Sequence, residues 1–148
     1  MPNSLPILIM RLDKSVDLPT RAHPGDAGLD LRAGKSFILP PQGGTALVPT
    51  GIAIAIPDGF AGLILPRSGL ALDQHVTVLN SPGLIDSGYR GEIKVLLVNH
   101  NITASVKIER AERIAQLVVI GTTDMEWRVT TELPPSDREA SGFGESGR

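Results

Sequence analysis

The sequence predicts an all-β fold, a jelly-roll sandwich or barrel with at most one short helix. Many short apolar segments are separated by turn residues, with 16 glycines and 12 prolines in 148 residues. A helical spacing of apolar residues occurs only in residues 68–74. Many short strands with this punctuation are typical of β-sandwiches and β-barrels.

Eight segments carry a strand pattern: residues 6–12, 29–31, 45–57, 60–65, 76–79, 92–99, 105–108 and 114–120. Residues 45–57 include Ile52, Ile54 and Ile56, which alternate with alanines as in a strand with one buried face. Residues 95–98 and 117–120 are apolar on both faces. These two strands are therefore expected to be covered on both sides, inside a sandwich or at a subunit interface.

Length and composition limit the classes of function. A chain of 148 residues is expected to form one domain with a real core. The net charge of -2 argues against a nucleic-acid polymer as partner, because proteins that bind phosphate backbones carry a basic excess. Without cysteine there is no disulfide or thiolate metal site, and the three separated histidines match no zinc spacing. No segment resembles a signal peptide or a membrane span, so we expect a cytoplasmic protein with no membrane partner.

The strongest functional signal is the stretch L-N-S-P-G-L-I-D-S-G-Y-R-G at residues 79–91. Its glycines and proline predict a tight hairpin. Asn80 offers an amide that can bind the donor and acceptor edge of a base, and Asp86 offers a carboxylate that can orient a water for attack. The alternative is that Asn80 and Asp86 only stabilise the turn and that Tyr89 only packs.

A second candidate site is L-P-R-S-G-L-A at residues 65–71, where a strand ends and a helical turn begins. Free backbone amides, the Ser68 hydroxyl and the Arg67 guanidinium would together form an anion site. The alternative is that Ser68 merely caps the helix and that Arg67 is a solvated surface charge.

The C-terminal residues 134–148 contain one large apolar side chain, Phe143. Such a segment cannot bury enough surface to become ordered alone, so we expect it to be mobile in isolation. Phe143 lies between two glycines and near Arg138. This pattern suits either a plain disordered terminus or a flap that stacks on a planar ligand and pairs with an anion.

Five motifs follow one another along the chain: A-G-L-D-L at 27–31, P-R-S-G at 66–69, N-S-P-G-L-I-D-S-G-Y-R-G at 80–91, R-I-A-Q-L at 113–117 and R-E-A-S-G-F-G-E-S-G at 138–147. Their order and separation resemble those of the trimeric dUTPases (dUTP diphosphatases), and the third motif is the most specific. The resemblance extends from about Arg11 to the C-terminus. It implies a jelly-roll domain at residues 1–133, a homotrimer with sites between subunits, and an arm at 134–148 that closes over a neighbouring subunit's site.

The resemblance also implies a reaction. The family hydrolyses dUTP to dUMP and pyrophosphate by water attack on the α-phosphorus with Mg²⁺, which keeps uracil out of DNA and supplies dUMP for thymidylate synthesis. Asp86 would engage the deoxyribose 3′-hydroxyl and orient or deprotonate the water. Asp30 would act near that water and the hydrated Mg²⁺ without ligating the ion directly, because Mg²⁺ on nucleotides keeps several waters. Gln116 would contribute an amide contact to the phosphates.

The substrate-binding residues implied by the resemblance are Arg67, Ser68, Gly69 and Gln116 on the triphosphate, Asn80, Gly83, Leu84, Ile85 and Lys94 around uracil, Asp86 and Tyr89 at the sugar, and Arg138, Phe143 and Gly144 in the arm. Tyr89 would select deoxyribose over ribose by steric exclusion. The arm departs from the family pattern at Glu139, Ser141 and Glu145. A carboxylate at the last of these would repel a triphosphate unless it points outward.

Two other functions are compatible with the sequence. One is a dCTP deaminase of the same fold, although no carboxylate can be assigned to the cytosine amino group. The other is a non-catalytic nucleotide-binding regulator. Ammonia release from dCTP would indicate the first, and dUTP binding without pyrophosphate release the second.

Overall fold

The computed structural model describes residues 4–136 and 140, and these residues form a β-protein with one short helix. In chain order the elements are β1 (Leu8–Arg11), β2 (Leu29–Arg32), β3 (Phe37–Leu39), β4 (Gly44–Pro49), β5 (Ile52–Ala55), β6 (Phe60–Leu65), α1 (Ser68–Gln74), β7 (Val76–Val78), β8 (Gly83–Ile85), β9 (Lys94–Asn99), β10 (Val106–Ile108) and β11 (Arg113–Gly121). The predicted all-β class is confirmed. No helix in the described part of the chain is long and apolar enough to cross a membrane.

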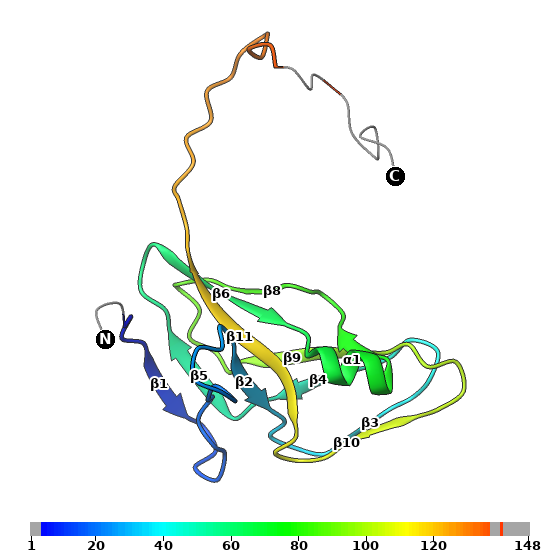
Figure 1. Cartoon of the computed structure of the whole chain (residues 1–148). Coiled ribbons are helices and arrows are strands. Elements are labelled where there is room, and N and C mark those ends of the chain that lie inside the picture. Colours follow the sequence, from blue (N-terminus) through cyan, green and yellow to red (C-terminus); the bar gives the residue numbers. More distant parts are fainter. Residues whose placement is uncertain (1–3, 137–139, 141–148) are drawn as a thin grey trace.

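The strands form two main sheets that pack face to face (Figure 1). One sheet has the order β2-β11-β6-β8 and the other the order β4-β9-β7, while β1 pairs with β5 and β3 with β10. All of these pairs are antiparallel. Ile64 and Leu117 from the first sheet share one buried core with Val95 and Leu97 from the second. Neither sheet closes on itself within the described residues, so of the two predicted architectures the sandwich is the one that fits.

Each of the eight predicted strand segments contains a strand, but residues 45–57 contain two. The chain turns between β4 and β5 at Thr50 and Gly51, and Gly51 has a φ of +73°, which favours glycine. Two three-residue strands, β3 and β8, were not predicted from the sequence.

The stretch at residues 79–91 is not the tight hairpin that its composition predicts. Strands β7 and β9 already pair with each other, and the Leu79 amide still donates to the Leu96 carbonyl at 2.9 Å. The chain then leaves this sheet, adds β8 to the edge of the other sheet beside β6, and returns to β9. The segment between β7 and β9 therefore links the two layers of the sandwich.

The two strands expected to be covered on both faces differ. In β9, Val95, Leu97 and Val98 are all buried. In β11, Leu117 is buried but Ile120 is exposed. A single chain therefore covers both faces of β9 and only the first part of β11.

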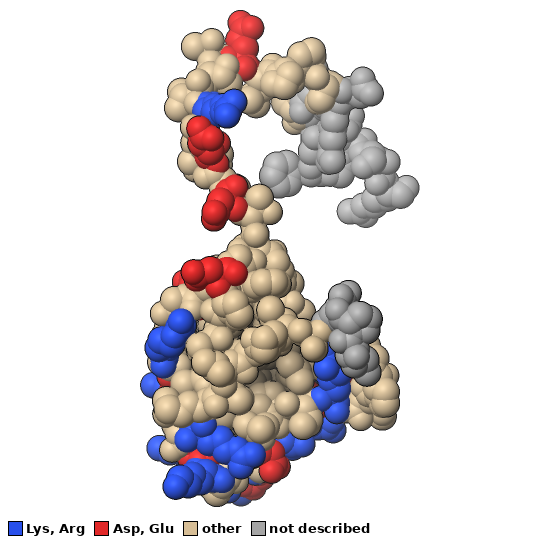
Figure 2. Space-filling view, turned by 90° about the vertical axis from the view of Figure 1, so that its left-hand side faces the viewer, with Lys and Arg blue, Asp and Glu red and all other residues tan. Residues whose placement is uncertain are grey.

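After β11 the chain extends away from the sheets, through residues 122–136 (Figure 1). Met125, Trp127 and Val129 alternate there with polar residues and are 77%, 86% and 100% exposed. Figure 2 shows both acidic and basic side chains along this segment, and Lys and Arg also gather on the body of the molecule. Such an apolar row is typical of a surface that another chain covers.

Candidate functional site

A pocket of about 420 Å³ lies between β8 and the start of β9, a size that suits a small ligand. Its lining includes seven residues that the sequence predicted for the site: Asn80, Gly83, Leu84, Ile85, Asp86, Tyr89 and Lys94. Four lining residues were not predicted: Leu47, Ile64, Glu92 and Ile93. The pocket thus has apolar walls with an amide, two carboxylates, an ammonium group and a phenol around it.

One side of this pocket is formed by strand backbone whose hydrogen-bonding groups are available to a ligand. Strand β8 pairs with β6 through Gly62 and Ile64 and is the last strand of its sheet. The outer edge of such a strand presents N–H and C=O groups that no neighbouring strand uses. Gly83 also gives room, because a Cβ there would lie 3.2 Å from the Ile64 Cβ and 3.6 Å from the Asn80 Nδ2.

Tyr89 is held by its neighbours in the turn between β8 and β9. Its amide donates to the Asp86 carbonyl at 3.1 Å, and its hydroxyl donates to the Glu92 carbonyl at 2.9 Å. Gly91 makes the second bond sterically feasible, because a Cβ at this position would lie only 2.5 Å from the Tyr89 hydroxyl. The Asp86 backbone and the Tyr89 ring are therefore fixed in one turn beside the pocket.

The floor of the pocket is attached to the β4–β5 turn. The Ile93 amide donates to the Ile52 carbonyl at 2.9 Å, and the buried Thr50 hydroxyl donates to the Ile93 carbonyl at 2.7 Å. The Glu92 carboxylate accepts from the Gly51 amide at 2.9 Å. These bonds explain why Glu92 and Ile93 line the pocket although no chemistry in the sequence singled them out.

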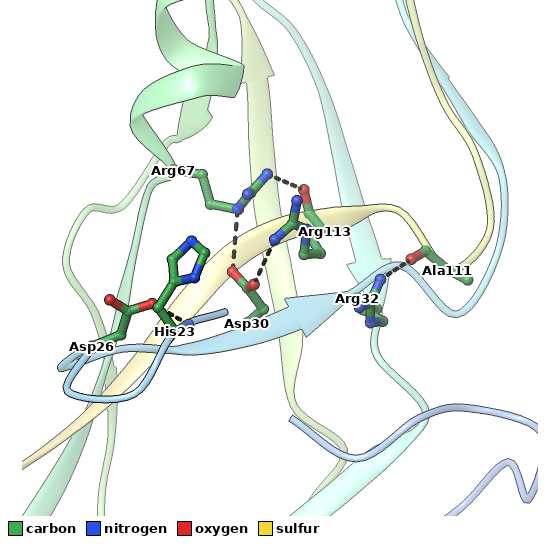
Figure 3. Close-up of polar contacts among 7 residues, drawn as sticks. All are labelled: His23, Asp26, Asp30, Arg32, Arg67, Ala111 and Arg113. Atoms are coloured by element: carbon green, nitrogen blue, oxygen red, sulfur yellow. Dashed lines mark hydrogen bonds and ion pairs between the residues drawn. The ribbon is translucent and has the colours of Figure 1, made fainter. Parts of the chain in front are cut away.

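A second polar cluster lies at the far end of the β2-β11-β6-β8 sheet (Figure 3). The Asp30 carboxylate is buried and forms ion pairs of 3.2 Å with both Arg67 Nε and Arg113 Nη1. Arg67 also donates from Nη1 to the Arg113 carbonyl at 3.2 Å. Asp30, expected beside the catalytic water, thus holds two guanidiniums with its carboxylate, and Arg113 was not predicted as a site residue.

Gln116 belongs to the same end of the sheet. It pairs in register with Asp30 on β2 and with Leu65 on β6, just before Arg67. Paired residues of antiparallel strands project from the same face, so the Gln116 amide lies on the side of Asp30.

Ser68 and Gly69 start α1 and are exposed. The capping position is Arg67, and no side chain there bonds to the helix start. The capping role considered for Ser68 is therefore not observed, and its hydroxyl is free of that bond.

Within one chain, the Asp86 side of the pocket lies far from Arg67 of the second cluster. Asp86 follows Ile85, which pairs with Gly62, whereas Arg67 lies five residues further along the chain from Gly62. At the rise of an antiparallel strand this separation is roughly 16 Å. A ligand that extends from Gly83 past Asp86 therefore runs away from the chain's own Arg67.

The dUTPase family model matches residues 14–147. This chain belongs to the dUTPase family. The match includes all five motifs and spans both described clusters, so the family predicted from the motifs is confirmed.

Curated dUTPase relatives are similar over most of the chain. Deoxyuridine 5′-triphosphate nucleotidohydrolases from Streptomyces coelicolor and Thermobifida fusca are 50% and 51% identical, over 97% and 94% of this chain and 78% and 77% of their own length. The enzyme from Gloeobacter violaceus is 48% identical over 95% of this chain and 96% of its own length.

Solved dUTPase structures share the fold. The Staphylococcus bacteriophage 80alpha dUTPase with dUpNHpp has a TM-score of 0.87 and 30% identity, covering 98% of this chain and all of its own. A mutant dUTPase from phage phi11 of S. aureus, which coordinates a structural Mg(II) ion, has a TM-score of 0.80 and 25% identity, over 86% of this chain and 98% of its own.

Two further expectations concern the C-terminal arm and a metal ion. Arg138, Phe143 and Gly144 of the fifth motif lie outside the described residues. Within residues 4–136, no group of three or more His, Cys, Asp or Glu side chains is arranged to hold a metal ion.

Proposed function

We propose that this chain hydrolyses dUTP to dUMP and pyrophosphate. The observation that carries the proposal is the pocket, which brings the Asn80 amide, the Asp86 carboxylate and the Tyr89 ring together beside an open strand edge. Family membership and the printed activity of relatives of similar length support the same reaction.

The pocket is suited to uracil. The outer edge of β8 offers backbone donors and acceptors from Gly83 to Ile85, and Asn80 adds a side-chain amide with both functions. A rigid backbone edge cannot reverse its donors and acceptors, so cytosine would leave buried polar groups unpaired. Tyr89, fixed against Gly91, would lie beside the sugar and exclude a 2′-hydroxyl.

Asp86 is the group that would activate the water. The water oxygen forms a bond to the α-phosphorus, and its proton passes to the Asp86 carboxylate. The bond from that phosphorus to the oxygen bridging the α- and β-phosphates breaks, and pyrophosphate leaves. A positioned general base of this kind contributes about 10²–10⁴-fold to the rate.

The triphosphate would be bound by a neighbouring copy of the chain. Arg67, Ser68 and Gln116 lie together but roughly 16 Å along the sheet from the Asp86 side of the pocket. A homotrimer with sites between subunits would bring the second cluster of one chain to the pocket of the next. Within the second cluster, two guanidiniums share one carboxylate, which leaves an excess of positive charge for phosphate.

Magnesium would be carried mainly by the nucleotide. Among the described residues the acidic side chains do not form a metal cage, so triphosphate oxygens and waters would supply the ligands, with Asp30 at most in the outer sphere. When bound, the ion would neutralise charge on the phosphate oxygens. The arm residues Arg138, Phe143 and Gly144 would close over the nucleotide.

The test is pyrophosphate release from dUTP, dTTP, dCTP and UTP, each with Mg²⁺ and then with a chelator. We expect release from dUTP alone, and less of it with the chelator. Ammonia release from dCTP would instead indicate a deaminase. Tight dUTP binding with no release from any nucleotide would indicate a regulator, and either result would overturn the proposal.

A further inference from the structure

We propose that Gly28 is a positioning residue, which keeps open the space that the Gln116 side-chain amide occupies. The inference rests on the proposed function, because it concerns the contact of Gln116 with the phosphates. It assigns a role to the glycine of the A-G-L-D-L segment, which neither the motif chemistry nor the pocket explains.

The steric evidence is direct. A Cβ on Gly28 would lie 2.4 Å from Gln116 Oε1, 3.1 Å from its Cβ and 3.3 Å from its Cδ. All three distances are shorter than an ordinary van der Waals contact between heavy atoms, about 3.5–4.0 Å between carbons. The Gln116 side chain therefore lies directly over the α-carbon of Gly28.

The strand register explains this arrangement. Gln116 pairs with Asp30, and the next residue, Leu117, pairs with Leu29. Gly28 is two residues before Asp30, so the two positions share one face of this strand. Gln116 projects from the same face of the neighbouring strand and can lie over either position. Its amide lies over Gly28, and the Asp30 carboxylate forms its ion pairs with Arg67 and Arg113.

The backbone itself does not require a glycine at this position. Among the described residues the glycines with positive φ are Gly25, Gly43, Gly51 and Gly59, and Gly28 is not one of them. The constraint that the structure shows is steric, because the Gln116 side chain occupies the space that a Cβ on Gly28 would need. Within the described residues the Gln116 amide makes no hydrogen bond, so this steric fit is what sets its position and its polar atoms are free for a ligand.

A methyl group on Gly28 should therefore displace the amide and leave the sheet intact. Oε1 is the end of a flexible side chain and can rotate away at little cost to folding, whereas the Gln116 Cβ is held by β11 and needs a shift of a few tenths of an ångström. The same rotation removes the amide from the side of Asp30 and Arg67, where the phosphates are proposed to bind. The predicted loss is in phosphate binding and catalysis, with little change in thermal stability.

The experiment is a double-mutant cycle with Gly28→Ala, Gln116→Ala and the combined variant, measured as kcat/KM for dUTP. We expect Gly28→Ala and Gln116→Ala each to lower kcat/KM by about tenfold to a hundredfold, the range for one hydrogen bond to a charged group. The combined variant should be no worse than Gln116→Ala alone, because Gly28 acts through Gln116. Binding of deoxyuridine, which has no phosphate, should be unchanged in all three.

The matched control is Gly121→Ala. Gly121 is on the same strand as Gln116, and a Cβ there would meet nothing within 4 Å. This variant should keep the parent activity. If Gly28→Ala lowers the melting temperature, the combined variant should restore the part of the loss that comes from Oε1 and Cδ, whereas the part from the Cβ, which alanine keeps, should remain.

Additive losses in the combined variant would overturn the inference, and so would full activity of Gly28→Ala. If the parent protein releases no pyrophosphate from dUTP, the proposed function fails. The cycle is then measured as affinity for dUpNHpp, where the same non-additivity is expected and its absence again overturns the role of Gly28.

Discussion

Asp86 and Tyr89 owe their positions to the turn that contains both. The Tyr89 amide bonds to the Asp86 carbonyl, its hydroxyl bonds to the Glu92 carbonyl, and its ring rests on Gly91. The roles proposed for them, as the base that activates a water and as the ring that excludes a 2′-hydroxyl, both need fixed positions. The turn supplies them with few residues.

Asp86→Asn tests the role of the carboxylate. The amide has nearly the same shape, so the affinity for dUpNHpp should change little. Turnover of dUTP should fall by about two orders of magnitude or more, because the amide cannot accept the proton of the water. Single-turnover kinetics and calorimetric binding would separate the two effects. Unchanged turnover would remove Asp86 from its proposed role.

Some residues of the site are predictable from their chemistry and others are not. Asn80, Asp86 and Tyr89 stand out because a bare turn does not need an amide, a carboxylate and a phenol. The contacts of Asp30 cannot be predicted in this way, because Arg113 is 83 residues away and meets it only through the pairing of β2 with β11.

At the scale of elements, β8 connects fold and site. It is three residues long, joins the edge of one sheet, and is reached by a chain that starts and ends in the other sheet. Sequence patterns did not reveal it, because three residues are too few for an alternation and its neighbours are turn residues. The division into β4 and β5 was missed because the apolar residues on both sides of the short P-T-G interruption at 49–51 were assigned to one strand segment.

Thr50→Val tests how the pocket floor is attached. Valine keeps the shape of threonine but leaves the Ile93 carbonyl without the 2.7 Å bond from the buried hydroxyl. We expect the free energy of unfolding to fall by about 0.5–1.5 kcal/mol, the net contribution of one hydrogen bond, because the Ile93 carbonyl keeps its bond from the Thr50 amide at 3.1 Å. Denaturant unfolding would measure it. The control is Thr45→Val on the preceding strand β4, where the side chain is exposed and little change is expected. Equal stability of the two variants would contradict the attachment.

At the scale of the molecule, two features bear on assembly. The Asp86 side of the pocket and Arg67 of the second cluster lie apart on one sheet, and the segment after β11 exposes Met125, Trp127 and Val129 to solvent. Both observations favour an assembly of several copies. The two-faced apolar strands indicated such an assembly from the sequence, and the register of β6 with β8 adds the separation between Asp86 and Arg67, which the sequence does not reveal.

The most direct test is complementation between two inactive variants, Asp86→Asn and Arg67→Gln, mixed as unfolded chains and refolded together. If each site takes Asp86 from one chain and Arg67 from another, about a quarter of the sites in a random equimolar mixture should be intact. Pyrophosphate release from dUTP should then rise far above the sum of the two variants refolded separately. A mixture no more active than that sum would contradict a site shared between subunits.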